Sequence, residues 1–197
     1  MNLRRFSQAI SEGDGISVIV DVDGPEAARD AQDAGAEALF VGSGLEARLP
    51  AIRAATELPI LVRYDGQQPN ALEGADACLV DMGEFSGSSV EEIRRGLGDE
   101  FELAPRIAKD DDLEFLLEQL DPEILVLAAR PGGADEESRL ERVLELLPDV
   151  PAGKLAIADI DATTREEVEE LERAGVDGVI VAAGNIAHLV GAAPPEV

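Results

Sequence analysis

The sequence is poor in the residues that support several kinds of site. Its 197 residues include no tryptophan, one tyrosine, one cysteine and one histidine. A single cysteine, Cys78, excludes an internal disulfide framework and favours a reducing, cytoplasmic location. Cys78 lies in an apolar stretch, and the histidine, His188, lies beside Leu189 and Val190. We therefore interpret both as packing residues rather than as a nucleophile and its base.

Long hydrophobic segments are also missing. The longest apolar runs, ILVLAA (124–129) and VIVAA (179–183), are far shorter than the roughly 20 residues that span a bilayer. The opening MNLRRFSQAISEGDG has two arginines but no apolar stretch behind them, unlike a signal peptide. We therefore expect no contact with a membrane.

Basic residues are scarce. The chain has 16 of them against 42 acids, a net charge of −26, and its lysines are Lys109 and Lys154. This charge repels phosphate backbones and disfavours nucleic-acid binding. The acids are spread along predicted helices, which indicates a solvated acidic surface of the kind that suits a salty or hot habitat.

The sequence does contain an internal repeat. Each copy reads as a helix, a short link and an apolar strand, and two copies close the helix with Ala-Gly and end the strand in glycine. The copies span 26–44, 71–83, 117–133 and 166–184. Gly35, Gly74 and Gly175 fall where the end of a helix favours a left-handed residue.

Eight apolar strands alternate with helices along the chain. We predict strands at about 16–22, 38–42, 58–64, 76–81, 101–106, 123–129, 154–159 and 178–182. We predict helices at about 25–34, 45–56, 67–73, 88–97, 110–120, 135–147 and 163–174, with a short one near 185–190. Eight such units favour an α/β fold, a parallel (βα)8 TIM barrel, over a doubly wound flavodoxin-like sheet, which would leave about three strands unused. We expect one unusually short barrel domain over 1–197.

The chain resembles the indole-3-glycerol phosphate synthase family along nearly its whole length. The similar segments are FSQAISEGDGISVIVDV (6–22), LPAIRAATELPILVRYD (49–65), DDDLEFLLEQLDPEILVLAARP (110–131) and DATTREEVEELERAGVDGVIVAAG (161–184). The resemblance implies a phosphate-type barrel. In the family it also implies a lyase of tryptophan biosynthesis, which closes an indole ring on a carboxyphenylamino sugar phosphate. That chemistry needs a general-acid lysine, a carboxylate base and a phosphate cradle, and no cofactor is expected.

The residues that carry this chemistry in the family are replaced here. The Glu-x-Lys at the end of the first strand becomes Asp21 and Asp23. Arg63 stands nearest the acid lysine of the third strand, and arginine is a poor proton donor because it stays charged. The glutamate of the fifth strand falls at Pro105 or Arg106. The family's motifs on the last three strands become Ala128, Ala129, Arg130, Ile157, Ala158, Asp159, Ile160, Ala182, Ala183 and Gly184. We therefore predict a degenerate, pseudoenzyme-like barrel without the synthase activity.

The predicted strand ends bring charged residues together. In a barrel, Asp21, Arg63, Arg106 and Asp159 would converge in one interior layer, with Asp81 nearby. The first interpretation is a charge-balanced network in which arginines bridge these carboxylates, Asp21 included. If Arg63 is buried in it, Arg63→Ala should cost about 3–5 kcal/mol. The candidates for a catalytic role are Asp21, Asp23, Arg63, Arg106 and Asp159.

Two other interpretations stay open. The first is a small-anion or phosphate site formed by Arg63, Arg106, Arg130, Gly184 and Asn185. Gly184 and Asn185 open the short last helix, and a helix N-terminus favours anions. The second is a divalent cation held by Asp21, Asp23, Asp159 and Asp161. Nearby arginines oppose a cation, so no metal is expected.

These interpretations give three functional hypotheses. The first is a degenerate scaffold or small-anion binder. The second is an active enzyme on a small sugar phosphate, residual synthase activity included. The third is a partner-binding barrel, because short helices after the third and eighth strands would leave core edges exposed. The expected ligand is small and anionic or phosphorylated, and the expected assembly is a monomer or small homo-oligomer.

Overall fold

Eight parallel strands form a closed barrel in a computed structural model of the chain, which describes residues 6–13, 15–66, 69–81, 93, 95–97, 101–129, 136–184 and 186–189. The strands are β1 (Ser17–Asp21), β2 (Ala38–Val41), β3 (Ile60–Arg63), β4 (Ala77–Asp81), β5 (Glu102–Ile107), β6 (Ile124–Ala128), β7 (Leu155–Asp159) and β8 (Gly178–Ala182). They follow one another around the barrel in chain order, and β8 pairs with β1. The predicted (βα)8 barrel is confirmed, and the open sheet is excluded.

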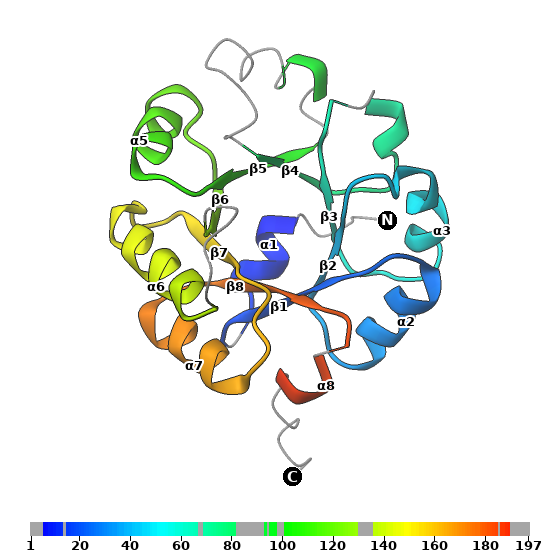
Figure 1. The fold of residues 1–197 in the computed structure, drawn as a ribbon. Helices are drawn as coiled ribbons and strands as arrows, with labels where there is room; N and C mark the ends of the chain where they lie inside the picture. The colour runs from blue at the N-terminus through cyan, green and yellow to red at the C-terminus, as the bar shows by residue number, and fades with distance from the viewer. Residues whose placement is uncertain are drawn as a thin grey trace.

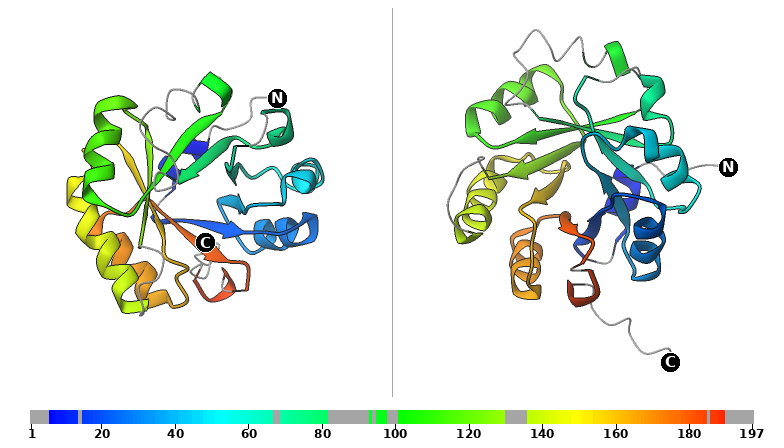
Figure 2. Two further views of the ribbon diagram at one scale, coloured as in Figure 1. Left: turned by 45° about the horizontal axis from the view of Figure 1, so that its top comes forward. Right: turned by 45° about the vertical axis from the view of Figure 1, so that its right-hand side comes forward.

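Helices surround the barrel (Figures 1 and 2). They are α2 (Pro25–Asp33), η1 (Glu46–Arg48), α3 (Leu49–Arg53), η2 (Pro69–Leu72), α5 (Asp110–Gln119), α6 (Glu136–Leu146), η4 (Leu147–Asp149), α7 (Arg165–Ala174) and α8 (Ile186–Leu189). The helix predicted at 45–56 is a 3-10 turn followed by a short α-helix, and the one at 67–73 is a 3-10 helix. The helix predicted at 88–97 lies mostly outside the described residues. No described helix is both long and apolar enough to cross a membrane.

The internal repeat builds every second strand of the barrel, β2, β4, β6 and β8. Two copies share an aspartate just before the strand. The backbone N–H and carboxylate of Asp76 bond the carbonyl and N–H of Ile60, and Asp177 bonds Ala156 in the same way. Each aspartate thus ties an even strand to the odd strand before it. In the second copy, Gly175 ends α7 in the left-handed conformation, with φ of 98°, as predicted.

Three apolar layers fill the interior of the barrel, each built from alternate strands. The strands tilt, so a layer advances about one residue from each strand to the next. Toward the carboxyl ends, the layers are Ala38, Ala77, Ile124 and Gly178; then Ile19, Leu61, Ala104 and Ile157; then Phe40, Leu79, Val126 and Ile180. Intervening side chains point outward and pack under the helices. The barrel interior beneath the mouth is therefore filled by apolar side chains.

A short helix that the sequence analysis does not predict closes the amino end of the barrel. In α1 (Phe6–Ser11), Phe6 and Ile10 are 0% and 2% exposed and join the interior cluster. The Ser7 N–H donates to Glu102 Oε2 (3.0 Å), and Ser17 Oγ donates to the Ile10 carbonyl (3.3 Å). Figure 1 shows α1 inside the ring of strands. Six residues make fewer than two turns, too few for periodicity to reveal a helix.

Candidate functional site at the barrel mouth

A fourth interior layer, at the carboxyl ends of the strands, is charged. The strand register places Asp21, Arg63, Arg106 and Asp159 in it, from β1, β3, β5 and β7. We call these four residues the charged layer. The alternation of side chains along each strand predicts this placement, because the odd strands turn these positions toward the barrel axis.

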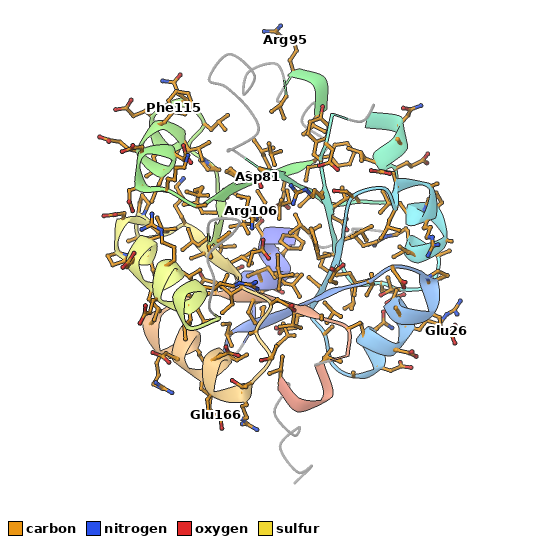
Figure 3. The ribbon with its side chains drawn as sticks, viewed as in Figure 1. Glu26, Asp81, Arg95, Arg106, Phe115 and Glu166 are labelled. Atoms are coloured by element: carbon orange, nitrogen blue, oxygen red, sulfur yellow. The ribbon has the colours of Figure 1, made fainter. Side chains whose placement is uncertain are left out.

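Ion pairs run across the mouth from β3 to β7. Arg106 Nε donates to Asp159 Oδ2 (2.6 Å), and its Nη1 donates to Asp81 Oδ2 (3.0 Å). Arg63 Nη2 lies 3.5 Å from the same oxygen of Asp81, and Arg63 Nε donates to Asp65 Oδ1 (3.2 Å). Figure 3 shows Asp81 and Arg106 inside the ring of strands. The predicted Asp–Arg network therefore exists, with Asp65 as a member that was not predicted.

Arg106 is the best-enclosed cation of this network. Its side chain is 15% exposed, against 26% for Arg63. Burial would lower the pKa of Arg106, but the carboxylates of Asp159 and Asp81 outweigh it and raise that pKa. Arg106 Nη2 makes no hydrogen bond to the described residues, and it is not among their buried atoms without a partner, Arg53 Nη1 and Glu102 Oε1. It therefore keeps a donor directed to solvent.

Asp21 stands apart from the ion pairs. Within the described residues it makes no ion pair, so the prediction that an arginine bridges it is wrong. Arg63 instead contacts Asp81 on the adjacent strand β4 and Asp65, two residues further along the sequence. Burial, then the charges of Asp159, Asp161 and Asp23, raise the pKa of Asp21. Asp21 nonetheless keeps much of its surface accessible to solvent, at the end of β1.

Small residues surround this free carboxylate at the next level outward. That level holds Gly42, Asp81, Ala128 and Ala182, from the even strands. Asp81 covers the layer near β4, and Ala128 is fully buried. Ala182, in register with Asp21, is exposed, and a methyl group on Gly42 would meet no other atom within 4 Å. The charged layer is therefore accessible beside β1, β2 and β8.

The remaining predicted ligand residues lie just beyond the strand ends or outside the described residues. Gly184 is exposed, with open space where a side chain would be, whereas Arg130 and Asn185 lie outside the described residues. Asp23 and Asp161 are exposed just beyond the ends of β1 and β7. In the described part of the chain, no three histidine, cysteine or acidic side chains are arranged to hold a metal ion.

The weaker candidates lie away from the mouth or at its edge. Cys78 is fully buried on the outer face of β4, and burial raises its pKa to about 12. Lys154 pairs with Asp121 (2.6 Å) just before β7, at the amino end of the barrel. Lys109 is exposed at the start of α5. The side chain of His188 in α8 is outside the described set.

The sequence pattern does not predict which positions leave the mouth accessible. Ala128 and Ala182 are interpreted from sequence as residues lost from a family motif, and Gly42 as a glycine at the end of a repeated strand. The available signal is the size of the side chain at the end of each even strand. Three of those four positions carry glycine or alanine.

Comparison with known proteins shows the fold and no more. No family model matches the sequence, and no curated protein matches it. The structure is similar to a thiamine phosphate pyrophosphorylase from Pyrococcus furiosus (18% identity, TM-score 0.64, 88% of this chain and 93% of that one). It is also similar to a protein from Aquifex aeolicus VF5 (12%, TM-score 0.72, 95% and 97%). A third similar structure is a phosphoenolpyruvate phosphomutase from Streptomyces platensis subsp. rosaceus (14%, TM-score 0.68, 91% and 80%).

These likenesses show that the chain has the TIM-barrel fold. At such low identity they do not transfer a reaction or a substrate. They also do not single out indole-3-glycerol phosphate synthase, so that resemblance remains a prediction.

Proposed function

We propose that the mouth of this barrel binds a small phosphorylated ligand, with Arg106 as its principal contact. We further propose that the chain does not catalyse indole-3-glycerol phosphate synthesis. The charged layer then acts as a polar floor on which the ligand's anionic group rests.

The geometry of Arg106 carries this proposal. Asp159 and Asp81 hold two of its nitrogen atoms, so the guanidinium is fixed before any ligand arrives. The third nitrogen, Nη2, makes no hydrogen bond to the described residues and is available to a ligand. A preorganised arginine with a free donor is a strong partner for a phosphate oxygen, because little side-chain entropy is lost on binding.

The fold is in keeping with such a ligand. Two of the similar structures are named for thiamine phosphate and phosphoenolpyruvate, both phosphorylated molecules. In TIM barrels, ligands bind at the carboxyl ends of the strands, where Arg106 lies. The paired Arg106 supports a phosphate site independently of these similar structures.

The synthase reaction lacks its proton donor. Asp23 and Arg63 stand where the resemblance places lysines, and an arginine stays charged at neutral pH. Lys154 is held by Asp121 at the other end of the barrel. Incubation of the purified protein with the carboxyphenylamino sugar phosphate should therefore give no indole-glycerol phosphate. Enzyme-dependent product formation, measured by its fluorescence, would contradict this.

The partner-binding alternative has less support. Phe115 on α5, at 37%, is the one large apolar side chain exposed among the described residues. A single exposed phenylalanine does not form an apolar docking patch.

Calorimetric titration with glycerol 3-phosphate, and with glycerol as the ligand without phosphate, tests the proposal. We expect the phosphate compound to bind and glycerol to show no binding. Arg106→Gln should weaken binding at least tenfold. Arg173→Gln should leave binding unchanged, because Arg173 is exposed in the last turn of α7, at the end of that helix away from the mouth.

Arg106→Lys keeps the test valid if the glutamine variant does not fold. Lysine retains the positive charge but loses the planar fork, so binding should weaken and remain measurable. Equal affinity in wild type, Arg106→Gln and Arg106→Lys would overturn the proposal, and so would equal affinity for glycerol and its phosphate.

A further inference from the structure

Asp21 is the one inward-facing carboxylate of the described mouth that no arginine neutralises. Asp81 contacts Arg63 and Arg106, and Asp159 contacts Arg106. Asp21 occupies the same layer as Arg106 and Asp159 yet has no cationic partner within the described residues. The mouth therefore has a paired side, on β3 to β7, and an unpaired side at β1.

The groups around Asp21 make its surroundings negative. The charges of Asp159 at the end of β7, of Asp161 just after it and of Asp23 just after β1 all raise the pKa of Asp21. Its partners in register, Phe40 on β2 and Ala182 on β8, carry no charge. Arg48 approaches this region, but its Nη1 donates to the Asp23 carbonyl (2.6 Å) rather than to a carboxylate.

The unpaired side is also the open side. Ala182 is exposed next to Asp21, and Gly42, just after β2, has free space where a side chain would be. Asp21 and Arg106 lie in the same layer, on β1 and β5, and Asp159 on β7 is paired with Arg106. The layer thus offers a small molecule a carboxylate in need of a cation and a guanidinium with a free donor.

We propose that Asp21 determines the ligand class of this mouth, and that the ligand is a small amino phosphate. This inference rests on the function proposed above. The phosphate group lies on Arg106 and the ammonium group faces Asp21. A cation there would relieve the repulsion between Asp21 and its acidic neighbours, and an uncharged group would not.

A pair of nearly identical ligands tests this. Phosphoethanolamine and ethyl phosphate share the phosphate and the two-carbon chain and differ in the ammonium group. Calorimetry at pH 7 should show phosphoethanolamine binding at least fivefold more tightly. Asp21→Asn should reduce this ratio to below twofold while ethyl phosphate still binds. Asp30→Asn, a change of an exposed acid on α2, should leave the ratio unchanged.

The pH dependence separates a ligand contact from a structural role. Because the pKa of Asp21 is raised, the preference for phosphoethanolamine should decline more steeply in wild type than in Asp21→Asn as the pH falls. Equal binding of both compounds, lost in Arg106→Gln, would overturn this inference and leave the phosphate site standing. Failure of both compounds to bind wild type would overturn the inference and the proposed function together.

Discussion

Arg106 links two carboxylates of the mouth that come from strands three apart, β4 and β7. It is positioned by β5, bonds Asp81 on β4, and reaches across β6 to Asp159 on β7. Ala128 is the β6 residue at the level outward of this contact, and its small side chain leaves room for the guanidinium to pass. The strength of such a pair depends on enclosure, because water screens exposed charges.

Arg106 is less exposed than Arg63, so its removal should lower the free energy of unfolding more. Arg106→Ala should lower the free energy of unfolding by about 2–3 kcal/mol, since it removes the arginine that pairs with Asp159 and leaves Asp81 with the longer contact to Arg63. Arg63→Ala should cost only about 1 kcal/mol, because Arg63 and Asp65 are 26% and 33% exposed. This is less than the 3–5 kcal/mol expected from the sequence for a buried Arg63. Urea unfolding measures both, and an equal or larger cost for Arg63 would contradict the ranking.

Asp21 should oppose folding at neutral pH. Its pKa is raised above the ordinary 3.8 in the folded chain, so the folded state holds this proton more tightly than the unfolded state. The carboxyl is therefore stabilising only in its neutral form, and stability is lost as the pH rises through the folded pKa.

Asp21→Asn should then raise the melting temperature at pH 7. The gain should shrink as the pH falls toward 3.8 and be lost below it, where the wild-type carboxyl is neutral in both states. Thermal unfolding in steps from pH 7 to pH 4 measures this, with Asp30→Asn as the control. A gain that does not change with pH, or a loss at pH 7, would contradict the raised pKa.

The strands were predictable from the sequence, and the details of the mouth were predictable only in part. Apolar runs that alternate with helical patterns locate β1 to β8, and strand alternation places Arg63, Arg106 and Asp159 inward. Which acid each arginine contacts depends on side-chain reach between neighbouring strands. Strand periodicity carries no information on that reach, so Asp65 and the isolation of Asp21 came only from the structure.

Helix α1 shows a different limit of sequence reasoning. Its six residues bury two apolar side chains, but the cavity that receives them is formed by strands far along the chain. The stabilising contact is therefore tertiary, and local pattern does not reveal it.

Removing the apolar contact of α1 should be costly. Phe6→Ala should lower the free energy of unfolding by about 3–4 kcal/mol, because Phe6 is 0% exposed and its loss leaves a cavity at the base of the barrel. Phe115→Ala provides a matched control at an exposed site and should cost less than about 1 kcal/mol. Chemical denaturation compares the two, and similar costs would mean that α1 does not plug the barrel.

The net charge of −26 acts on the entire barrel. Only 16 basic residues are present to offset 42 acids, and several of them are already committed to ion pairs. The folded state concentrates the unbalanced carboxylates and repels itself, and dissolved salt screens that repulsion over about 10 Å at 0.1 M and 3 Å at 1 M.

Salt should therefore stabilise the fold. The melting temperature should rise by several degrees between about 0.1 and 1 M KCl. A variant with the exposed Glu114, Glu118, Glu166 and Glu170 changed to glutamine should show a smaller rise, because it has less charge to screen. A melting temperature that is constant or falls with KCl would show that self-repulsion does not limit stability.

A crystal structure grown in inorganic phosphate tests the central claim most directly. The proposed site predicts a phosphate at the barrel mouth, with an oxygen about 3 Å from Arg106 Nη2 and the pairs from Arg106 to Asp81 and Asp159 still in place. A mouth without phosphate, at a concentration that saturates other anion sites of the crystal, would contradict the claim and leave the ion pairs a purely structural network.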